Sequence, residues 1–162
     1  MTRRPPIDDP AVKARETVYR LLKIRLRSEK EIVSKLAAKG IPPDVIQTTV
    51  EYFKKARFLD DAVFTRAWIN SRLNKPFGAQ RIRFELRQKG VDEAIIRELL
   101  AVSEEEELDS VLGLAQRRWK KYKGIDPQKA KRRLFEFLAR RGFRPAVIQK
   151  ALRQLTRTHD DT

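Results

Sequence analysis

One pattern occurs three times in this chain and constrains its fold more than any other sequence feature. Each copy has two apolar residues four positions apart, then a basic residue directly before a glycine, then a further isoleucine. The copies are Ile32, Leu36, Lys39-Gly40-Ile41 and Ile46; Ile82, Leu86, Lys89-Gly90-Val91 and Ile96; and Leu134, Leu138, Arg141-Gly142-Phe143 and Ile148. The glycines lie 50 and 52 residues apart, a period that suits three helices per repeat.

Each copy predicts a helix that buries one stripe and ends at its glycine. A left-handed residue often follows a helix end, and this conformation costs an ordinary residue about 1 kcal/mol but glycine almost nothing. The preceding basic residue lies at the negative end of the helix dipole. The residues that follow, Pro42-Pro43, Asp92-Glu93 and Pro145, favour the start of the next helix.

A further helix is expected upstream of each pair, starting at Asp8 or Asp9, at Asp60 or Asp61, and at Ser103. Ser103 and Glu106 have the spacing of a capping box, and no strand pattern interrupts the helices. The prediction is an all-α fold of three tandem three-helix repeats, residues 1–59, 60–102 and 103–162, the last with a short C-terminal tail. Because such short units bury little surface alone, we expect them to stack into an elongated, curved array.

The charge of the chain indicates an anionic partner. There are 37 Lys and Arg against 22 Asp and Glu, a formal net charge of +15, which divides over the three repeats as +7, +2 and +6. A polyanion or an acidic protein surface is the expected neighbour, and we expect one copy of the chain to bind as a monomer. The alternative is that basic residues only keep the helices soluble.

The residue types that catalysis needs are nearly absent. The chain has no cysteine, and its one histidine, His159, lies near the C-terminus. Its six glycines form no phosphate-binding loop, and the pair Asp60-Asp61 is better explained as a helix cap than as a metal site. We therefore expect no catalytic residue, no cofactor, no metal and no small-molecule substrate. A third functional class is an enzyme whose active site uses an unfamiliar set of residues.

No membrane association is expected from the sequence. The chain has no apolar run near the roughly 18 residues that span a bilayer and no signal-peptide stretch after its N-terminal methionine. The prediction is a cytoplasmic protein.

The candidate binding residues are cations on the faces opposite the apolar stripes. The strongest set lies in the second and third repeats, and a smaller set lies nearby: Arg81, Arg83, Arg87, Lys129, Arg132, Arg133 and Arg140, with Arg72, Lys75 and Lys123 next. Tyr19, Trp68 and Trp119 occupy comparable places in the three first helices, each with a basic residue four positions later. Such aromatics are more often core anchors, and base stacking is the alternative.

Ordered motifs along nearly the whole chain resemble the RecX family. They are Leu59-Asp60-Asp61-Ala62-Val63-Phe64, Trp68, Asn70-Ser71-Arg72, Lys75-Pro76-Phe77-Gly78, Arg81-Ile82, Glu85-Leu86 and Lys89-Gly90-Val91. The pieces from Leu21 to Gly40 and from Arg140 to Leu152 are similar to the first and last units of the family.

The resemblance implies three three-helix units, no enzymatic activity, and binding along the RecA filament on single-stranded DNA. It also implies that the recombinase, ATP hydrolysis and co-protease activities of RecA are restrained, which would modulate DNA repair and the SOS response. The alternative is an autonomous nucleic-acid-binding protein that acts on DNA directly.

The glycine pattern makes a prediction about stability. If Gly90 has positive φ, Gly90→Val should lower the free energy of unfolding by about 1 kcal/mol or more, because valine is strained there. Unchanged thermal unfolding of this variant would refute the predicted helix end.

Overall fold

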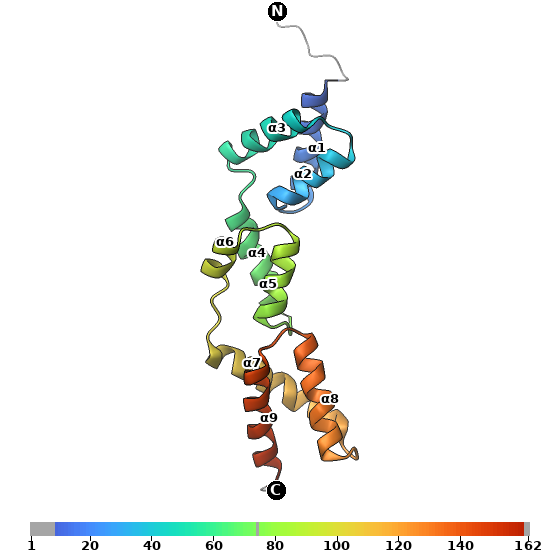
Figure 1. Ribbon diagram of the computed structural model, residues 1–162, viewed down its shortest axis with the longest axis vertical. Helices are drawn as coiled ribbons and strands as arrows, with labels where there is room; N and C mark the ends of the chain where they lie inside the picture. The colour runs from blue at the N-terminus through green and yellow to red at the C-terminus, as the bar shows by residue number, and fades with distance from the viewer. Residues whose placement is uncertain (1–8, 74, 161–162) are drawn as a thin grey trace, which may run out of the picture. The chain divides into compact units, whose positions relative to one another are not determined.

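The structure, a computed structural model, describes residues 9–73 and 75–160. Every regular element in these ranges is helical, which confirms the predicted all-α class (Figure 1). The elements are α1 (Pro10–Ile24), α2 (Glu29–Ala38), α3 (Pro43–Lys55), α4 (Asp61–Leu73), α5 (Ala79–Gln88), α6 (Glu93–Leu99), α7 (Glu104–Trp119), the 3₁₀ helix η1 (Lys120–Tyr122), α8 (Pro127–Arg140) and α9 (Pro145–Asp160).

The helices begin where the capping residues predict. Asp9 caps α1 by accepting a hydrogen bond from the Ala11 amide at 2.8 Å. Asp60 caps α4 in the same way, with Oδ1 2.8 Å from the Ala62 amide. Ser103 and Glu106 form the predicted capping box at the start of α7. Helix α6 stops one residue before Leu100, which is nevertheless buried.

The three repeated glycines adopt the predicted left-handed conformation, with φ of 72° at Gly40, 74° at Gly90 and 83° at Gly142. Each closes its helix with a Schellman motif, in which the amide after the glycine donates back five residues. These bonds run from Ile41 to Leu36 (3.2 Å), from Val91 to Leu86 (3.1 Å) and from Phe143 to Leu138 (3.4 Å).

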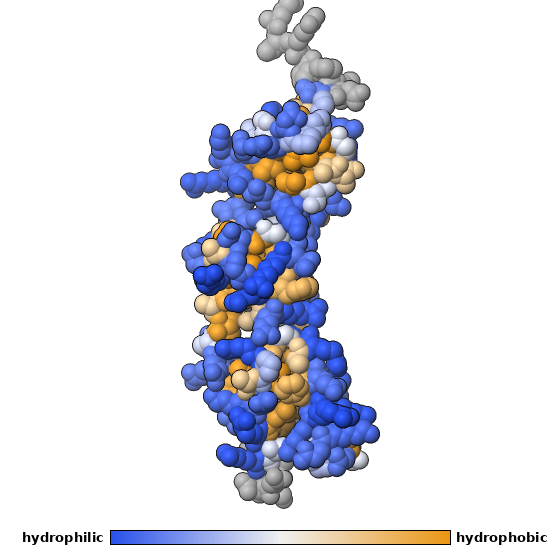
Figure 2. All heavy atoms as spheres, viewed as in Figure 1, coloured by the Kyte–Doolittle hydropathy of each residue, from blue (hydrophilic) through white to orange (hydrophobic). Residues whose placement is uncertain are grey.

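The apolar positions of the repeat form the core. All nine are buried, with 0–7% of each side chain exposed: Ile32, Leu36, Ile46, Ile82, Leu86, Ile96, Leu134, Leu138 and Ile148. Burying one such side chain stabilises the fold by about 1.5–3 kcal/mol. Figure 2 shows that hydrophilic residues cover most of the surface in view, with smaller areas of hydrophobic residues among them.

The chain forms two compact units. One runs to Trp68 and includes Leu86–Leu99; the other takes Ile69–Glu85 and continues from Leu100. Helices α4 and α5 therefore each contribute residues to both units. We propose residues 59 and 102 as the limits between the three sequence repeats.

In the first unit, the start of α2 contacts the glycine turn that follows α5. The Ser28 hydroxyl, which caps α2, donates to the Lys89 carbonyl at 2.7 Å. The first amide of α2, that of Glu29, donates to Asp61 Oδ1 at 2.8 Å. A Cβ atom on Gly90 would lie 2.4 Å from Cδ of Lys30, so this contact also requires glycine.

In the second unit, the start of α5 contacts the glycine turn after α8 in an equivalent way. The Gly78 amide donates to the Arg141 carbonyl at 2.8 Å, and the Gln80 amide donates to the Gly142 carbonyl at 3.2 Å. Ser28 and Gly78 both lie 12 residues before the glycine of their own repeat, and Lys89 and Arg141 both directly precede the contacted glycine. The same junction is therefore formed twice.

The close approach of two backbones at the second junction makes a prediction with an internal control. A Cβ atom on Gly78 would lie 2.2 Å from the Gly142 carbonyl oxygen, whereas one on Gly113, within α7, would meet only the Arg117 side chain at 3.8 Å. We expect Gly78→Ala to lower the free energy of unfolding by about 2 kcal/mol or more, because the two turns must separate. Gly113→Ala should raise it by about 0.5–1 kcal/mol through helix propensity. Chemical denaturation of both variants measures this, and equal stability would contradict it.

Candidate nucleic-acid and protein interface

In the second unit, three arginines surround the ring of Phe77, in the segment between α4 and α5. The guanidinium carbon of Arg81 lies 4.4 Å from the ring centroid, and those of Arg72 and Arg141 lie 5.8 Å from it. Glu85 bridges two of them, with carboxylate oxygens 2.6 Å from Arg72 Nε and 3.2 Å from Arg81 Nε. Two of the predicted candidates therefore share one site.

Arg141 connects this site to a second aromatic ring. Its guanidinium carbon also lies 4.7 Å from the centroid of Phe137 on α8, and Arg118 of α7 lies 4.5 Å from the same ring. Arg141 Nη1 donates to the Pro76 carbonyl at 3.2 Å. We call Arg72, Arg81, Arg118 and Arg141, with Phe77 and Phe137, the arginine–phenylalanine cluster. Guanidinium groups that stack on rings keep their charge while they cover apolar surface.

Two hollows of about 440 Å³ border this cluster. One is lined by Arg81, Phe84, Glu85 and Arg140, with Gln80 and Gly142. The other is lined by Lys75, Pro76, Phe77, Ser110, Leu114, Arg117 and Phe143. The structure therefore places the predicted candidates Lys75 and Arg140 beside the cluster.

Helix α8 carries the next group of candidates. Lys129, Arg132 and Arg133 are exposed, while Ala130 and Leu134 are buried on the other side of the helix. Only a long contact of 4.0 Å from Arg132 to Glu136 involves them in an ion pair within the described residues. Their positive charges are thus presented to the solvent.

The remaining candidates are dispersed. Arg87 lies in the first unit, where Nε is 2.7 Å from the Glu93 carboxylate, and Arg83 is half-buried on α5. Lys123 follows η1 and lines a small hollow with Trp119 and Tyr122.

The three repeated aromatics do not share one environment. Trp119 is half-buried and packs against the core of the second unit, and Trp68 is half-buried and stacks on Phe64 at 5.7 Å. Lys89 Nζ lies 5.1 Å from the Trp68 ring centroid. Tyr19 is 46% exposed, so the core-anchor interpretation suits the tryptophans better than the tyrosine.

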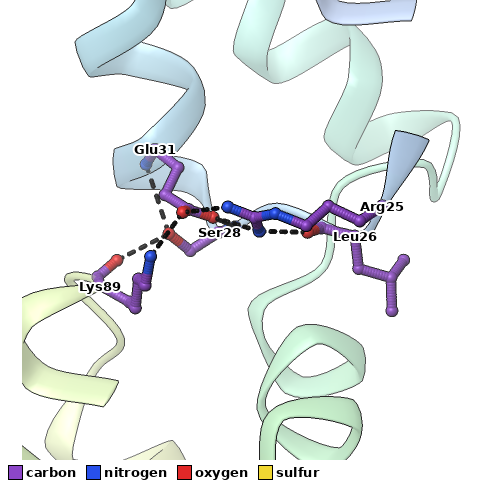
Figure 3. A network of polar contacts seen from close by, with 5 residues as sticks. All are labelled: Arg25, Leu26, Ser28, Glu31 and Lys89. Carbon is purple, nitrogen blue, oxygen red and sulfur yellow. Dashed lines mark hydrogen bonds and ion pairs between the residues drawn. The ribbon is translucent and has the colours of Figure 1, made fainter. Parts of the chain in front are cut away.

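The first junction contains a polar network around Glu31. Its carboxylate accepts hydrogen bonds from Arg25 Nη2 at 2.8 Å and from Lys89 Nζ at 2.7 Å, beside the bond from Ser28 to the Lys89 carbonyl (Figure 3). Burial by itself raises the pKa of Glu31, but the hydrogen bonds from Arg25, Lys89 and the Ser28 backbone outweigh it. Together they lower the pKa from 4.5 to about 2.

Metal ligands do not gather in the described part of the chain, where no group of three His, Asp or Glu side chains is placed to hold an ion. The side chain of His159 lies outside the described residues. Both members of the Asp60-Asp61 pair accept helix-start amides, which confirms their capping role. None of the helices in the described ranges is long and apolar enough to cross a membrane.

Sequence reasoning missed the centre of the arginine–phenylalanine cluster. The sequence pattern predicts only a helix-dipole role for Arg141, and neither Arg118 nor Phe77 is among the predicted site residues. The repeat itself carried a signal for Arg141, because Lys89 at the equivalent position also contacts the preceding repeat. Nothing in the local sequence indicated that Phe77 and Phe137 share one arginine.

Comparisons with known proteins identify the three groups of helices. Residues 14–53, 60–100 and 104–152 match models described as the first, second and third three-helix domains of RecX. A protein named regulatory protein RecX from Chlorobium phaeobacteroides is 36% identical, over 90% of this chain and 95% of its own length. One of the same name from Thermobifida fusca is 31% identical, over 91% of this chain and 80% of its own length.

A solved structure shows the same fold. The crystal structure of RecX from Lactobacillus salivarius aligns with a TM-score of 0.83 at 20% identity, covering 91% of this chain and 97% of that one. These results define an all-helical protein made of three three-helix domains. The chain belongs to the RecX family.

The Glu31 network predicts a pH dependence of stability. Since the folded-state pKa is lower than the ordinary value of 4.5, the ionised carboxylate stabilises the fold above about pH 4.5, and this contribution is lost as the pH falls toward 2. We expect the ionised carboxylate to contribute about 1–2 kcal/mol to the free energy of unfolding. This is less than the whole pKa shift implies, because part of the network is exposed to water.

The measurement is urea unfolding of the wild type and Glu31→Gln between pH 2.5 and 7. Glutamine keeps the capping-box geometry but does not titrate, so the stability difference should shrink as the pH falls. A difference that is independent of pH would contradict the assigned charge interaction.

Proposed function

We propose that this chain is a non-enzymatic regulator that binds the RecA filament on single-stranded DNA. It acts as a cytoplasmic monomer and restrains the recombinase, ATP-hydrolysis and co-protease activities of RecA, and so modulates DNA repair and the SOS response. The observation that carries the proposal is membership of the RecX family along most of the chain, since the similar proteins are named regulatory proteins. The formal net charge of +15 suits a filament that contains nucleic acid.

The exposed cations of α8 are the proposed contacts to phosphate or to acidic protein surface. Lys129, Arg132 and Arg133 are held in place by the buried stripe beneath them, so they can meet an anion without rearrangement of the helix. In the arginine–phenylalanine cluster, Arg72 and Arg81 already share Glu85. We therefore assign the cluster to positioning of its surroundings, with Lys75 and Arg140 at its border as further contacts.

The same exposed cations favour a second candidate function, direct binding to DNA without RecA, because a cationic helix face suits bare phosphates equally well. The two functions differ in stoichiometry. A regulator of the filament should suppress DNA-dependent ATP hydrolysis by RecA when it is substoichiometric to RecA. A protein that acts on DNA alone should inhibit only when enough of it is present to coat the DNA, and that result would replace the proposed function.

Neutralising the α8 cations tests the contact surface. We expect Arg132→Gln with Arg133→Gln to weaken binding to the RecA–DNA filament and to reduce its salt dependence, by about 0.7 in the logarithmic slope for each single-strand phosphate contact that is lost. The matched control is Arg97→Gln with Arg153→Gln, which removes the same charge from two exposed positions outside α8. Equal weakening by both pairs would show that only net charge matters.

A further inference from the structure

The end of α3 has the same hydrogen-bond pattern as the three glycine corners but different residues. The Phe58 amide donates to the Phe53 carbonyl at 3.0 Å, and the Arg57 amide donates to the Lys54 carbonyl at 3.0 Å, as in a Schellman motif. Arg57 occupies the left-handed position with φ of 59°, and among the described residues it is the one non-glycine with positive φ. This helix therefore ends with backbone strain that a glycine would remove.

The residue after the left-handed position is also unusual. In the three glycine corners this residue is apolar and buried: Ile41, Val91 and Phe143 are 6%, 5% and 3% exposed. Phe58, at the equivalent position after Arg57, is 56% exposed. Strain and an exposed aromatic ring therefore occur side by side where the chain elsewhere uses glycine and a buried side chain. Such departures from the most stable choice gather at functional positions.

Two further exposed aromatic rings lie beside Phe58. Tyr19 of α1 and Tyr52 of α3 are 46% and 44% exposed, and their hydroxyl oxygens are 3.4 Å apart. Both rings pack edge-to-face on the buried ring of Phe53, at 4.8 and 5.2 Å between centroids. The ring centroid of Phe58 lies 6.2 Å from that of Tyr19 and 6.4 Å from that of Phe53. We call Tyr19, Tyr52 and Phe58 the aromatic platform.

Basic residues lie beside this platform or close to it in sequence. The Arg15 guanidinium lies 5.2 Å from the Tyr52 ring centroid. Lys23 follows Tyr19 by one helical turn and Lys55 follows Tyr52 by three residues, so both share a helix side with a platform residue. Within the described residues no ion pair joins Arg15, Lys23, Lys55 or Arg57 to a carboxylate, and Glu16 is the acidic residue one turn before Tyr19.

We propose that the aromatic platform binds single-stranded nucleic acid, with unstacked bases on Tyr19, Tyr52 and Phe58 and phosphates against the adjoining cations. Rings exposed beside cations that lack ion pairs suit a ligand with flat faces and a charged backbone, and base–aromatic stacking is tolerant of sequence. An apolar protein segment would leave the four cations without partners. The inference goes beyond both candidate functions, because it assigns base stacking to a surface of the first unit that neither of them includes.

The test uses the full chain and two fluorescent probes of equal length, an oligothymidylate and an abasic strand, at low salt. We expect the wild type to bind the oligothymidylate more tightly than the abasic strand. Phe58→Ala should weaken oligothymidylate binding about five-fold or more, as expected for the loss of one base–aromatic stack, and leave abasic binding nearly unchanged. Val63→Ala is the control, because Val63 is a 45% exposed apolar residue on α4 that belongs neither to the platform nor to the candidate interface, and both affinities should stay unchanged.

A second variant separates binding from stability. Arg57→Gly should raise the melting temperature, because glycine relieves the left-handed strain, and should weaken binding to both strands because it removes a phosphate contact. If Arg57 has only a structural role, the Arg57→Gly variant should have a higher melting temperature and an unchanged affinity for both strands. This result would overturn the assignment of Arg57 as a phosphate contact.

Three results would overturn the platform itself. The first is equal affinity of the wild type for the oligothymidylate and the abasic strand, which would mean that only phosphates are bound. The second is unchanged oligothymidylate affinity in a folded Phe58→Ala variant. The third is a Phe58→Ala variant that binds the oligothymidylate normally but inhibits RecA less, which would assign the surface to protein contact. The titration of RecA ATP hydrolysis does not use the fluorescent strands. The proposed regulation of RecA and the proposed aromatic platform can therefore fail separately.

Discussion

The contact between a helix start in one repeat and the glycine turn of the next repeat holds successive repeats together, and the other features of the structure follow from it. It occurs once in each compact unit, and both times the acceptor is the carbonyl directly before a left-handed glycine. A donor can reach this carbonyl only because the glycine has no Cβ atom, which at Gly142 would lie 2.5 Å from the Arg81 amide nitrogen. The turn thus ends its own helix and also receives the start of another. Gly40, whose corner has no neighbouring atom within 4 Å of a Cβ position, shows the same turn without the second role.

These junctions determine how the basic residues are used. The cations before Gly90 and Gly142 contact the preceding repeat: Lys89 pairs with Glu31, and Arg141 lies over the Phe77 ring. Positive charge at these positions therefore contributes to assembly of the fold as well as to the field around it. The cations of α8 differ because a helix presents one side to its core and the other to solvent, and Arg132 and Arg133 lie on the second side. A high net charge alone does not distinguish the two kinds of cation.

The end of α3 differs from the three glycine helix ends, because it keeps a strained backbone and an exposed ring. Three helix ends use glycine and bury the next side chain, whereas α3 keeps Arg57 strained and Phe58 exposed. The buried Phe53 ring supports this arrangement, because Tyr19, Tyr52 and Phe58 all pack around it. The buried ring of Phe53 can thus hold the exposed rings in position. In this chain, the packing of α1 against α3 provides this support.

The helices and their ends follow from residue type and from spacing along the chain. Capping by Asp9 and Ser103, the turns at Gly40, Gly90 and Gly142, and the buried stripes all depend on residues within about five positions of one another, so periodicity and residue type predict them. Which distant residues meet could not be predicted from local sequence. Asp61 accepts the first amide of α2, Arg141 joins Phe77 to Phe137, and Tyr52 lies beside Tyr19. These contacts depend on how whole helices pack against one another, because side chains far apart in sequence become neighbours only when their helices do.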